Sequence, residues 1–582
     1  MMPSAAARNS DRQAVASAAW LRALKLTAHI DDEPSRIFPL VLDEMARLAD
    51  APALTGVRES YTYAGLAAQA RRYANWAAAA GVRRGDVVAL MLANRPDYLA
   101  AWAGISRAGG VAALINTNLR GEALDHCLNV ADPRHIIVEE DLAPELGNTM
   151  AKLWRHDEGF ARRIAGFSGA VPGSASDITL DDDALLIFTS GTTGLPKAAK
   201  VSHRRVMLWT HWFAGMMDAG PADRLYNCLP MYHSAGGVAA PGALLVAGGA
   251  VICREKFSAS AFWPDVAASG ATIFQYIGEL CRYLLAADGT AENVPAHRLR
   301  LACGNGMAGN VWEAFQARFR IPQVLEFYAA TEGNFSLYNM EGKPGAIGRV
   351  PPHLAPLMPV ALLRYDEATG QPARSADGLC IAAGRGQTGE AVCKITDGAA
   401  RFEGYTDQAA NARKILRNVF AHGDAWFRSG DLMRRDAEGF YYFVDRVGDT
   451  FRWKGENVAS MEVASVLGTA PGVIAAAVYG VAVPGAEGRA GMAALEVAED
   501  FDLAALYGHV AIRLPAYARP VFLRRAASLA MTGTFKHRKN ALARDGFDPA
   551  RIADPLFADI GGAYVPLDAA LYSRISSGLV RI

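Results

Sequence analysis

The segment Leu185-Leu-Ile-Phe-Thr-Ser-Gly-Thr-Thr-Gly-Leu-Pro-Lys197 is an apolar run that ends in a loop rich in glycine and hydroxyl groups. The apolar part predicts a buried strand, and the two glycines allow tight turns with exposed backbone N–H groups. Such a loop can hold phosphates, because backbone N–H groups, hydroxyls and an ammonium group all attract anions. The predicted contacts are Thr189, Ser190, Gly191, Thr192, Thr193, Gly194 and Lys197.

The spacing of this loop differs from that of a P-loop NTPase. The Walker motif GxxxxGK is followed by Ser or Thr, whereas Ala198 follows Lys197 here. The sequence therefore disfavours that class. Taken alone, the glycines and threonines are equally typical of an ordinary polar turn between a strand and a helix.

Short apolar runs alternate with helical patterns on both sides of the loop. The run Asp86-Val-Val-Ala-Leu-Met-Leu92 predicts a strand, and Pro96–Ala108 predicts the helix that follows it. The glycine-rich segment 373–405 predicts a small β-rich module. We therefore expect an α/β protein with a large multi-sheet N-terminal body that carries this module, residues 1–445, and a smaller α+β C-terminal domain, residues 446–582.

Composition limits the possible classes of protein. A chain of 582 residues is too long for one ordinary core, and 51% hydrophobic residues indicate a globular protein. Lys plus Arg (59) balance Asp plus Glu (59), so the net charge gives no indication of a nucleic-acid partner. The seven cysteines have no CxxC spacing, which argues against a metal knuckle or a disulfide framework and favours the cytoplasm.

Two segments bear on membranes. The first twenty residues contain charges and lack the apolar run of a secretory signal, so export is not expected. Residues 235–253 are uncharged over a length that could span a bilayer, but glycine and alanine dominate them and Pro241 interrupts them. We interpret this segment as a buried helix followed by a strand.

Three ordered motifs resemble those of the adenylate-forming enzymes, which include acyl-CoA synthetases, luciferases and peptide-synthetase adenylation domains. The loop at 189–197 is similar to their signature loop, Tyr328-Ala-Ala-Thr-Glu332 to their aromatic-x-x-Thr-Glu element, and Ser429-Gly-Asp431 to their ribose-binding element. A narrower resemblance is to the fatty acid transport protein and very-long-chain acyl-CoA synthetase branch. It rests on Glu332-Gly-Asn334, on the run 442–458 and on Thr532-Gly-Thr-Phe-Lys-His537.

The resemblance implies roles for these motifs. Glu332 is the expected Mg²⁺ ligand, which suits a hard cation that bridges a carboxylate and substrate phosphates, with Thr189 completing the metal shell. Thr331 is expected at the α-phosphate. Asp431 can accept hydrogen bonds from two ribose hydroxyls, and Arg446 is the second ribose contact. The other implied nucleotide or CoA contacts are Gly304, Asn305, Gly306, Tyr328, Lys454, Gly455 and Glu456.

Three further expectations also follow from the resemblance. Lys536 is the mobile catalytic lysine that neutralises charge developing between the carboxylate and the α-phosphate. His233 lies near the acyl and nucleotide sites, and Ala235-Gly-Gly237 follows it where some long-chain relatives have a tryptophan gate, so no such gate is assumed. The small domain is mobile and turns about a hinge at Gly448 and Asp449 between the two half-reactions.

The sequence thus predicts a fatty acyl-CoA synthetase that uses Mg²⁺, ATP and CoA and forms an acyl-AMP intermediate. One alternative is a fatty acyl-AMP ligase that loads a carrier protein. The other is a membrane-associated fatty acid binding or transport protein, against which the charged set of Glu332, Asp431, Arg446 and Lys536 argues. Acyl chain length, oligomeric state and a peripheral contact with the inner face of the membrane are left open.

Overall fold

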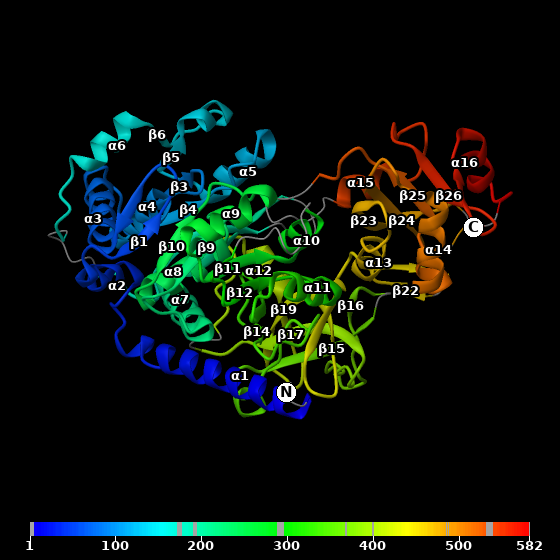
Figure 1. Ribbon diagram of the computed structural model, residues 1–582, viewed down its shortest axis with the longest axis horizontal. Helices are drawn as coiled ribbons and strands as arrows, with labels where there is room; N and C mark the ends of the chain where they lie inside the picture. Colours follow the sequence, from blue (N-terminus) through cyan, green and yellow to red (C-terminus); the bar gives the residue numbers. More distant parts are fainter. Residues whose placement is uncertain are drawn as a thin grey trace. The chain divides into compact units, whose positions relative to one another are not determined.

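The computed structural model describes residues 5–171, 177–189, 195–287, 296–366, 369–397, 401–454, 456–484, 486, 488–530, 539–580 and 582. The chain forms two compact units (Figure 1). The first comprises Met1–Val360, Cys393–Arg417 and Asp424–Phe427. The second comprises Ala361–Val392, Asn418–Gly423 and Arg428–Ile582.

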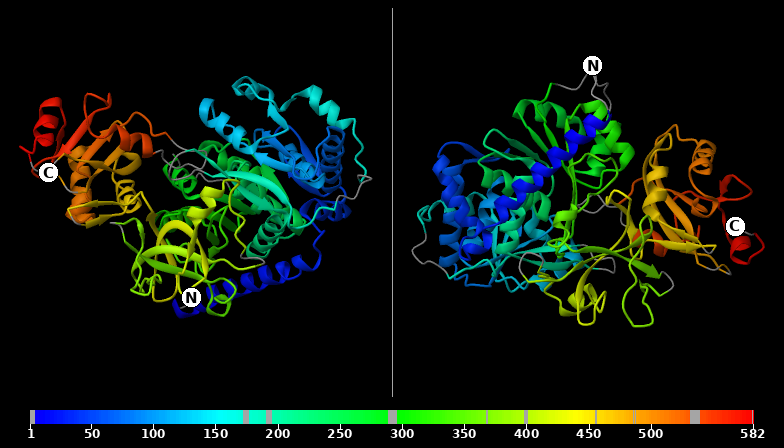
Figure 2. Two further views of the ribbon diagram at one scale, coloured as in Figure 1. Left: turned by 180° about the vertical axis from the view of Figure 1, so that it is seen from behind. Right: turned by 90° about the horizontal axis from the view of Figure 1, so that it is seen from below.

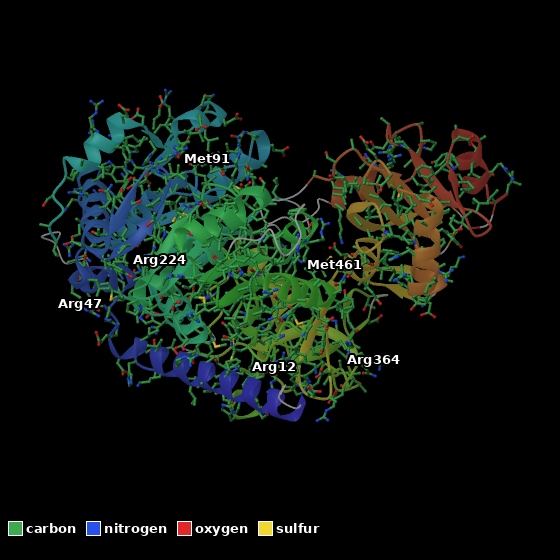
Figure 3. The ribbon with its side chains drawn as sticks, viewed as in Figure 1. Arg12, Arg47, Met91, Arg224, Arg364 and Met461 are labelled. Atoms are coloured by element: carbon green, nitrogen blue, oxygen red, sulfur yellow. The ribbon has the colours of Figure 1, made fainter. Side chains whose placement is uncertain are left out.

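One sheet of the first unit has six strands in the order β6-β5-β3-β4-β7-β8. All are parallel except β8, which runs antiparallel to β7. The central strands are almost continuously apolar, as expected for a parallel sheet that is buried on both faces. Met91, which is labelled in Figure 3, ends β3 and is fully buried. The strands are β3 (Val87–Met91), β4 (Val111–Leu114), β5 (His135–Glu139), β6 (Lys152–His156), β7 (Asp183–Thr189) and β8 (Lys197–Ser202).

The other large sheet has eight strands in the order β14-β13-β12-β11-β9-β10-β1-β2. Its six central strands are parallel, and the edge strands β14 and β2 are antiparallel to their neighbours. The strands are β1 (Pro52–Thr55), β2 (Ser60–Thr62), β9 (Arg224–Asn227), β10 (Ala250–Cys253), β11 (Ile273–Ile277), β12 (Leu301–Asn305), β13 (Gln323–Ala329) and β14 (Ser336–Asn339).

The helices of the first unit connect these strands. They confirm the helix predicted from Pro96 and the buried interpretation of residues 235–253, which form the π-helix η4 (Ala235–Ala239), helix α8 and strand β10. The α-helices are α1 (Ala5–Thr27), α2 (Phe38–Met45), α3 (Tyr63–Ala79), α4 (Pro96–Arg107), α5 (Gly121–Ala131), α6 (Glu158–Ala165), α7 (His203–Met217), α8 (Ala240–Ala247), α9 (Ala259–Ser269), α10 (Gly278–Ala286), α11 (Gly309–Phe319) and α12 (Gln408–Lys414).

Helix α1 was not predicted from the sequence. It is a long helix that lies along α7 (Figure 2). A Cβ atom on Gly215 of α7 would come within 2.4 Å of the Ala23 backbone, so the two helices approach at a glycine. The Trp20 ring packs edge-on against that of Trp212, with 5.7 Å between centroids. Among the helices of the described ranges, none has both the length and the apolar character needed to cross a bilayer.

A third sheet, formed by residues 360–446, contains the β-rich module. Its order is β16-β15-β17-β19-β18, and β20 pairs with β19. The module is therefore confirmed, although it extends beyond the predicted range at both ends. Its strands are β15 (Val360–Asp366), β16 (Gln371–Pro372), β17 (Thr388–Lys394), β18 (Ile415–Arg417), β19 (Ala425–Arg435) and β20 (Tyr441–Arg446).

The C-terminal part of the second unit has its own core. A five-stranded sheet in the order β23-β24-β25-β26-β27 packs with four helices around Val478, Leu495, Val510 and Phe522. The α/β class with a smaller α+β C-terminal part is thus confirmed. The elements are β21 (Phe451–Trp453), β22 (Glu456–Val458), α13 (Ser460–Leu467), β23 (Val473–Ala482), β24 (Arg489–Val497), α14 (Leu503–Arg513), β25 (Phe522–Arg525), α15 (Lys539–Asp545), β26 (Leu556–Asp559), β27 (Tyr564–Pro566) and α16 (Ala569–Ser576).

Candidate active site

The predicted site residues of the first unit follow the carboxyl ends of its parallel strands. Thr189 ends β7, and His233 lies in the loop after β9. Gly306 follows β12, and the pair Thr331 and Glu332 follows β13. Open α/β sheets bind ligands at the carboxyl ends of their strands, so these residues, which come from both large sheets, lie where ligand sites are expected.

Glu332 is a buried carboxylate with cationic and hydroxyl partners. It is 8% exposed, and its Oε1 lies 3.4 Å from the Lys414 Nζ. Burial acts to raise the pKa of Glu332, but the Lys414 charge and a hydrogen bond from the Tyr405 hydroxyl outweigh it and hold the pKa below its ordinary value. The carboxylate is therefore ionised at neutral pH and can serve as a hard oxygen ligand.

The phosphate loop begins and ends on paired strands. Thr189 lies opposite Lys197 in the β7–β8 ladder, and Ser190, Gly191, Thr192, Thr193 and Gly194 between them lie outside the described residues. The Lys197 Nζ lies 5.8 Å from the centroid of the Tyr405 ring. Burial lowers the pKa of Lys197, and the nearby charges of Arg413 and Lys414 lower it further. Lys197 and Glu332 thus share Tyr405 and Lys414 as neighbours.

Thr331 connects the Glu332 segment with the His233 loop. Its hydroxyl lies 3.3 Å from that of Ser234, the residue after His233. Its carbonyl accepts a hydrogen bond of 2.9 Å from Arg205 of α7. The structure therefore brings together Thr331, Glu332 and the loop that carries His233.

Three buried amide side chains fix the His233 loop. Asn94 donates to the Leu229 carbonyl at 2.8 Å and accepts from the Met231 N–H at 2.7 Å. Asn227 and Gln275 donate to the carbonyls of two consecutive residues of η4, at 2.8 and 2.9 Å. Because these amides hold the backbone on both sides of His233, the loop has a defined course.

The Gly304-Asn305-Gly306 segment is held by hydrogen bonds to a buried carboxyl group. Glu326 of β13, which is 1% exposed, accepts hydrogen bonds from the backbone N–H groups of Gly306 and Met307 and from the Tyr276 hydroxyl. Gly306 has φ 80°, which favours glycine. Burial raises the pKa of Glu326 to about 8. Tyr328 lies two residues further along β13, so it belongs to the same strand as this support.

Asp431 and Arg446 meet in the second unit. They are opposite each other in the β19–β20 ladder, and the Arg446 Nε lies 3.5 Å from the Asp431 Oδ1. Gly430 has φ 78°, and the Ser429 hydroxyl accepts a hydrogen bond of 3.1 Å from the Asp431 N–H. The two residues predicted to contact ribose are thus neighbours, with Asp431 inside β19 and Arg446 at the end of β20.

The predicted hinge forms a tight turn. The Asp449 N–H donates to the Arg446 carbonyl at 3.0 Å, and Gly448 within this turn has φ 93°. Lys539 of α15 lies 3.8 Å from the Asp449 carboxylate. Lys454 has φ 52° and follows strand β21. Gly455 and Lys536 lie outside the described residues.

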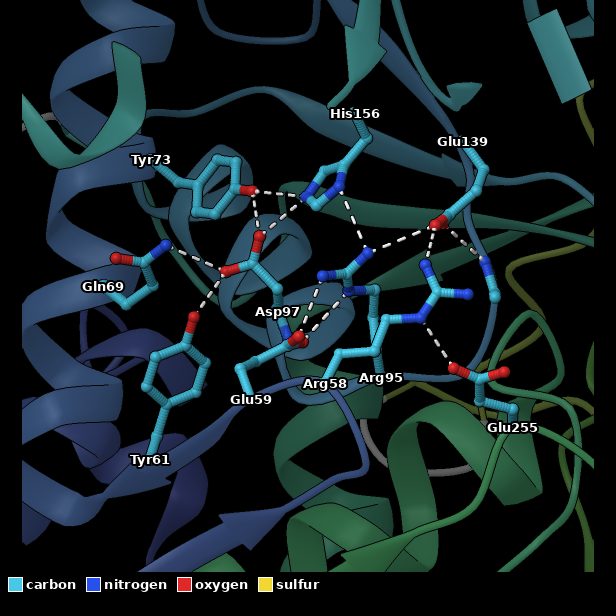
Figure 4. Close-up of polar contacts among 11 residues, drawn as sticks. Arg58, Glu59, Tyr61, Gln69, Tyr73, Arg95, Asp97, Glu139, His156 and Glu255 are labelled. Atoms are coloured by element: carbon cyan, nitrogen blue, oxygen red, sulfur yellow. Dashed lines mark hydrogen bonds and ion pairs between the residues drawn. The ribbon is translucent and has the colours of Figure 1, made fainter. Parts of the chain in front are cut away.

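A buried polar network ties the ends of three strands in the six-stranded sheet (Figure 4). Arg95 after β3 pairs with Glu59 at 2.8 Å and with Glu139, at the end of β5, at 3.2 Å. Burial acts to raise the pKa of Asp97, but His156 at the end of β6, together with the other donors, holds it below its ordinary value. The donors to Asp97 are Tyr61, Gln69, Tyr73 and His156. The network therefore stiffens the sheet edge that also carries Thr189.

Sequence reasoning missed the supporting residues of the site. Tyr405 and Lys414 lie more than seventy residues after Glu332 in the chain, the first at the end of the predicted β-rich module and the second beyond it. Arg205 and Glu326 occur in an ordinary helix and an ordinary strand, with no distinctive spacing. A titratable residue inside an apolar strand, as at Glu326, is the one signal that could have indicated a specific role.

The fold and this site define an adenylate-forming enzyme, and comparison with known proteins agrees. The AMP-binding enzyme family matches residues 42–405, and the AMP-binding enzyme C-terminal domain matches residues 462–536. Long-chain fatty acid transport protein 1 of Homo sapiens is 42% identical over 569 residues, which cover 93% of this chain and 87% of that protein.

Solved structures with low sequence identity show the same fold. The ATP-bound MatB from Rhodopseudomonas palustris matches with a TM-score of 0.72 at 24% identity and covers 86% of this chain and 98% of its own. The anthranilate CoA ligase AuaEII in complex with anthranoyl-AMP matches with a TM-score of 0.74 at 20% identity, over 88% and 98% of the two chains. The chain therefore belongs to the AMP-binding enzymes, in the branch of the long-chain fatty acid transport proteins.

Proposed function

We propose that this protein activates a long-chain or very-long-chain fatty acid with ATP and passes the acyl group from acyl-AMP to CoA. The observation that carries this proposal is the buried, ionised Glu332 at the carboxyl edge of the sheet, next to Thr331 and to the lysine that closes the phosphate loop. A site of this kind suits a nucleoside triphosphate with a bound cation. Similarity to the fatty acid transport proteins supports a fatty carboxylate as the other substrate.

Magnesium fits the residues that are present. Glu332, which is buried and ionised, would hold the ion together with Thr189 and substrate phosphates. This is the arrangement that Mg²⁺ prefers, because it keeps waters and binds through one or two carboxylates plus phosphate oxygens. When bound, the ion would offset phosphate charge and polarise the P–O bonds.

The remaining residues orient the reactants. In the first step, a fatty carboxylate oxygen attacks the α-phosphorus and pyrophosphate leaves, while Thr331 and Lys197 contact the phosphates and Lys536 neutralises the charge that develops. In the second step, the CoA thiolate attacks the acyl carbon and AMP leaves. His233 lines the site where the acyl group and nucleotide meet, on a loop that Asn94 holds in place.

The second unit would supply the ribose and hinge residues. Asp431 accepts from the ribose hydroxyls with Arg446 beside it, and the chain divides near Asp445 into the adenylation domain 1–445 and the small domain 446–582. The two family matches, which end at 405 and begin at 462, lie on either side of this boundary. Gly448 and Asp449 serve as the hinge between adenylation and thioester formation, and the run at Lys454, Gly455 and Glu456 contributes nucleotide or CoA contacts.

An acceptor exchange tests the proposed function. The purified protein is given ATP, magnesium and fatty acids from short to very long, with either CoA or a phosphopantetheine-loaded carrier protein. We expect thioester formation with CoA and a preference for long chains. Transfer only to the carrier would establish the acyl-AMP ligase instead, and fatty acid binding without AMP release would establish a binding or transport protein. Fractionation of cells would test the proposed cytoplasmic location and a peripheral membrane contact.

A further inference from the structure

Helix α12 is anchored to the strand that leaves the phosphate loop. The segment before it runs beside β8: the Thr406 N–H donates to the Ala198 carbonyl at 3.0 Å, and the Lys200 N–H donates to the Gly404 carbonyl at 2.9 Å. Asn411 of α12 bonds both the N–H and the carbonyl of Tyr405, at 2.6 and 3.0 Å. These bonds fix α12 relative to strands β7 and β8, the pair that carries the phosphate loop and is called the phosphate hairpin below.

Lys414 ends α12 at the centre of the site. Its Nζ lies 3.4 Å from the Glu332 Oε1 and 5.4 Å from the centroid of the Phe427 ring. A Cβ on Gly333 would meet that ring at 2.8 Å, so a glycine after Glu332 is what lets Phe427 pack there. The Lys414 side chain is 23% exposed, which leaves it partly open to solvent.

Three cations lie together beside the phosphate hairpin. The charges of Arg413 and Lys414 both act on Lys197. Lys414 pairs with Glu332, and a metal ion on Glu332 would add positive charge there. A cluster of cations of this kind favours an anion with several charges.

We propose that Lys414, assisted by Arg413, binds the pyrophosphate part of ATP and the pyrophosphate that leaves it. This assignment deepens the proposed function and rests on it. Without nucleotide, Lys414 pairs with Glu332 and keeps that carboxylate ionised and in place. An ammonium at this position is a charge-assisted donor to phosphate oxygens, and it lies on the same side of the site as Lys197.

Calorimetric binding to the full-length protein tests the proposal. Magnesium pyrophosphate, ATP and AMP are titrated separately into the wild type, Lys414→Ala, Lys414→Arg and the control Lys200→Ala. Lys200 lies on β8 and pairs with Asp183 at 2.8 Å, so its loss removes one lysine of the same unit without touching Glu332. We expect Lys414→Ala to weaken pyrophosphate and ATP binding about tenfold or more and AMP binding less than about twofold.

Comparison of the four proteins with the three ligands separates the possible outcomes. Lys414→Arg should keep most of the pyrophosphate affinity, and Lys200→Ala should keep all of it. Equal weakening for all three ligands, or wild-type affinity for all three in Lys414→Ala, would overturn the assignment. Failure of the wild type to bind ATP and pyrophosphate would instead overturn the proposed function. Thermal unfolding of Lys414→Ala at the wild-type temperature would show that its binding loss is not a folding defect.

Discussion

Replacing Arg205 by methionine should disconnect the Thr331 peptide from the core of the first unit. The Arg205 guanidinium is 8% exposed and has three partners. Its Nε lies 3.5 Å from Glu403, and its two terminal nitrogens donate to the carbonyls of Thr331 at 2.9 Å and Arg401 at 3.1 Å. Methionine has a similar length but no donor, so it leaves the Glu403 charge buried and removes the hydrogen bond to Thr331.

The structure indicates the size of the effect. Breaking a buried ion pair by removing one partner costs about 3–5 kcal/mol. Glu403 retains hydrogen bonds from the Ser202 N–H at 2.8 Å and the Ser202 hydroxyl at 2.5 Å, and it keeps an ion pair with Arg401 at 3.6 Å. We therefore expect a loss no larger than the lower end, about 3 kcal/mol. The double variant Arg205→Met/Glu403→Gln contains no unpaired charge and should regain most of this stability. Adenylation should stay reduced about tenfold or more in both variants, because neither restores the donor to Thr331.

Two measurements on the same proteins check this prediction. Thermal unfolding reports the stability of the single and double variants, and fatty acid-dependent pyrophosphate exchange reports adenylation. A single variant as stable as the wild type would contradict the ion-pair argument. A double variant with normal exchange would show that Arg205 has no role in positioning Thr331.

The remaining predictions concern other parts of the site. Lys536→Ala should abolish adenylate formation but largely spare thioester synthesis from supplied acyl-adenylate, and equal losses would refute its role. Gly448→Pro should damage acyl-CoA production far more than pyrophosphate exchange, because proline cannot adopt the φ of 93° seen here; parallel losses at normal thermal unfolding would count against the hinge. Glu326 keeps its proton in the native state up to about pH 8, whereas in the unfolded chain it loses the proton near its ordinary pKa. The protonated side chain therefore adds to the free energy of unfolding at low pH, and this contribution is lost as pH rises from the ordinary pKa through about 8. Between pH 6 and 9 the wild type should lose about 2–3 kcal/mol relative to Glu326→Gln, whereas parallel stability curves would contradict this assignment.

The main elements could be predicted because their patterns are local. The apolar run after Asp86 became β3, and the helical pattern from Pro96 became α4, since periodicity and proline at a helix start act within one element. The interpretation of residues 235–253 also held, because glycine is required there by close packing. A Cβ on Gly237 would lie 1.8 Å from the Met231 carbonyl oxygen.

The supporting contacts could not be predicted because they depend on tertiary packing. No local pattern connects Lys414 with Glu332, or Arg205 with Thr331, since each pair is joined only when a helix packs against a loop far away in the sequence. Helix α1 was missed for a similar reason. Its apolar stripe around Trp20 becomes meaningful only against α7, and its alanine-rich sequence has no distinctive turn signals.

A single-turnover reaction shows whether the protein forms acyl-AMP before it forms acyl-CoA. The protein is mixed in excess over ATP labelled at the α-phosphate, with magnesium and a long-chain fatty acid, and CoA is added after the first phase ends. We expect labelled acyl-AMP and free pyrophosphate to form before CoA is added. After the addition, one AMP and one acyl-CoA should form for each adenylate consumed. Release of ADP and phosphate, or acyl-CoA formation without a labelled acyl-AMP, would contradict it.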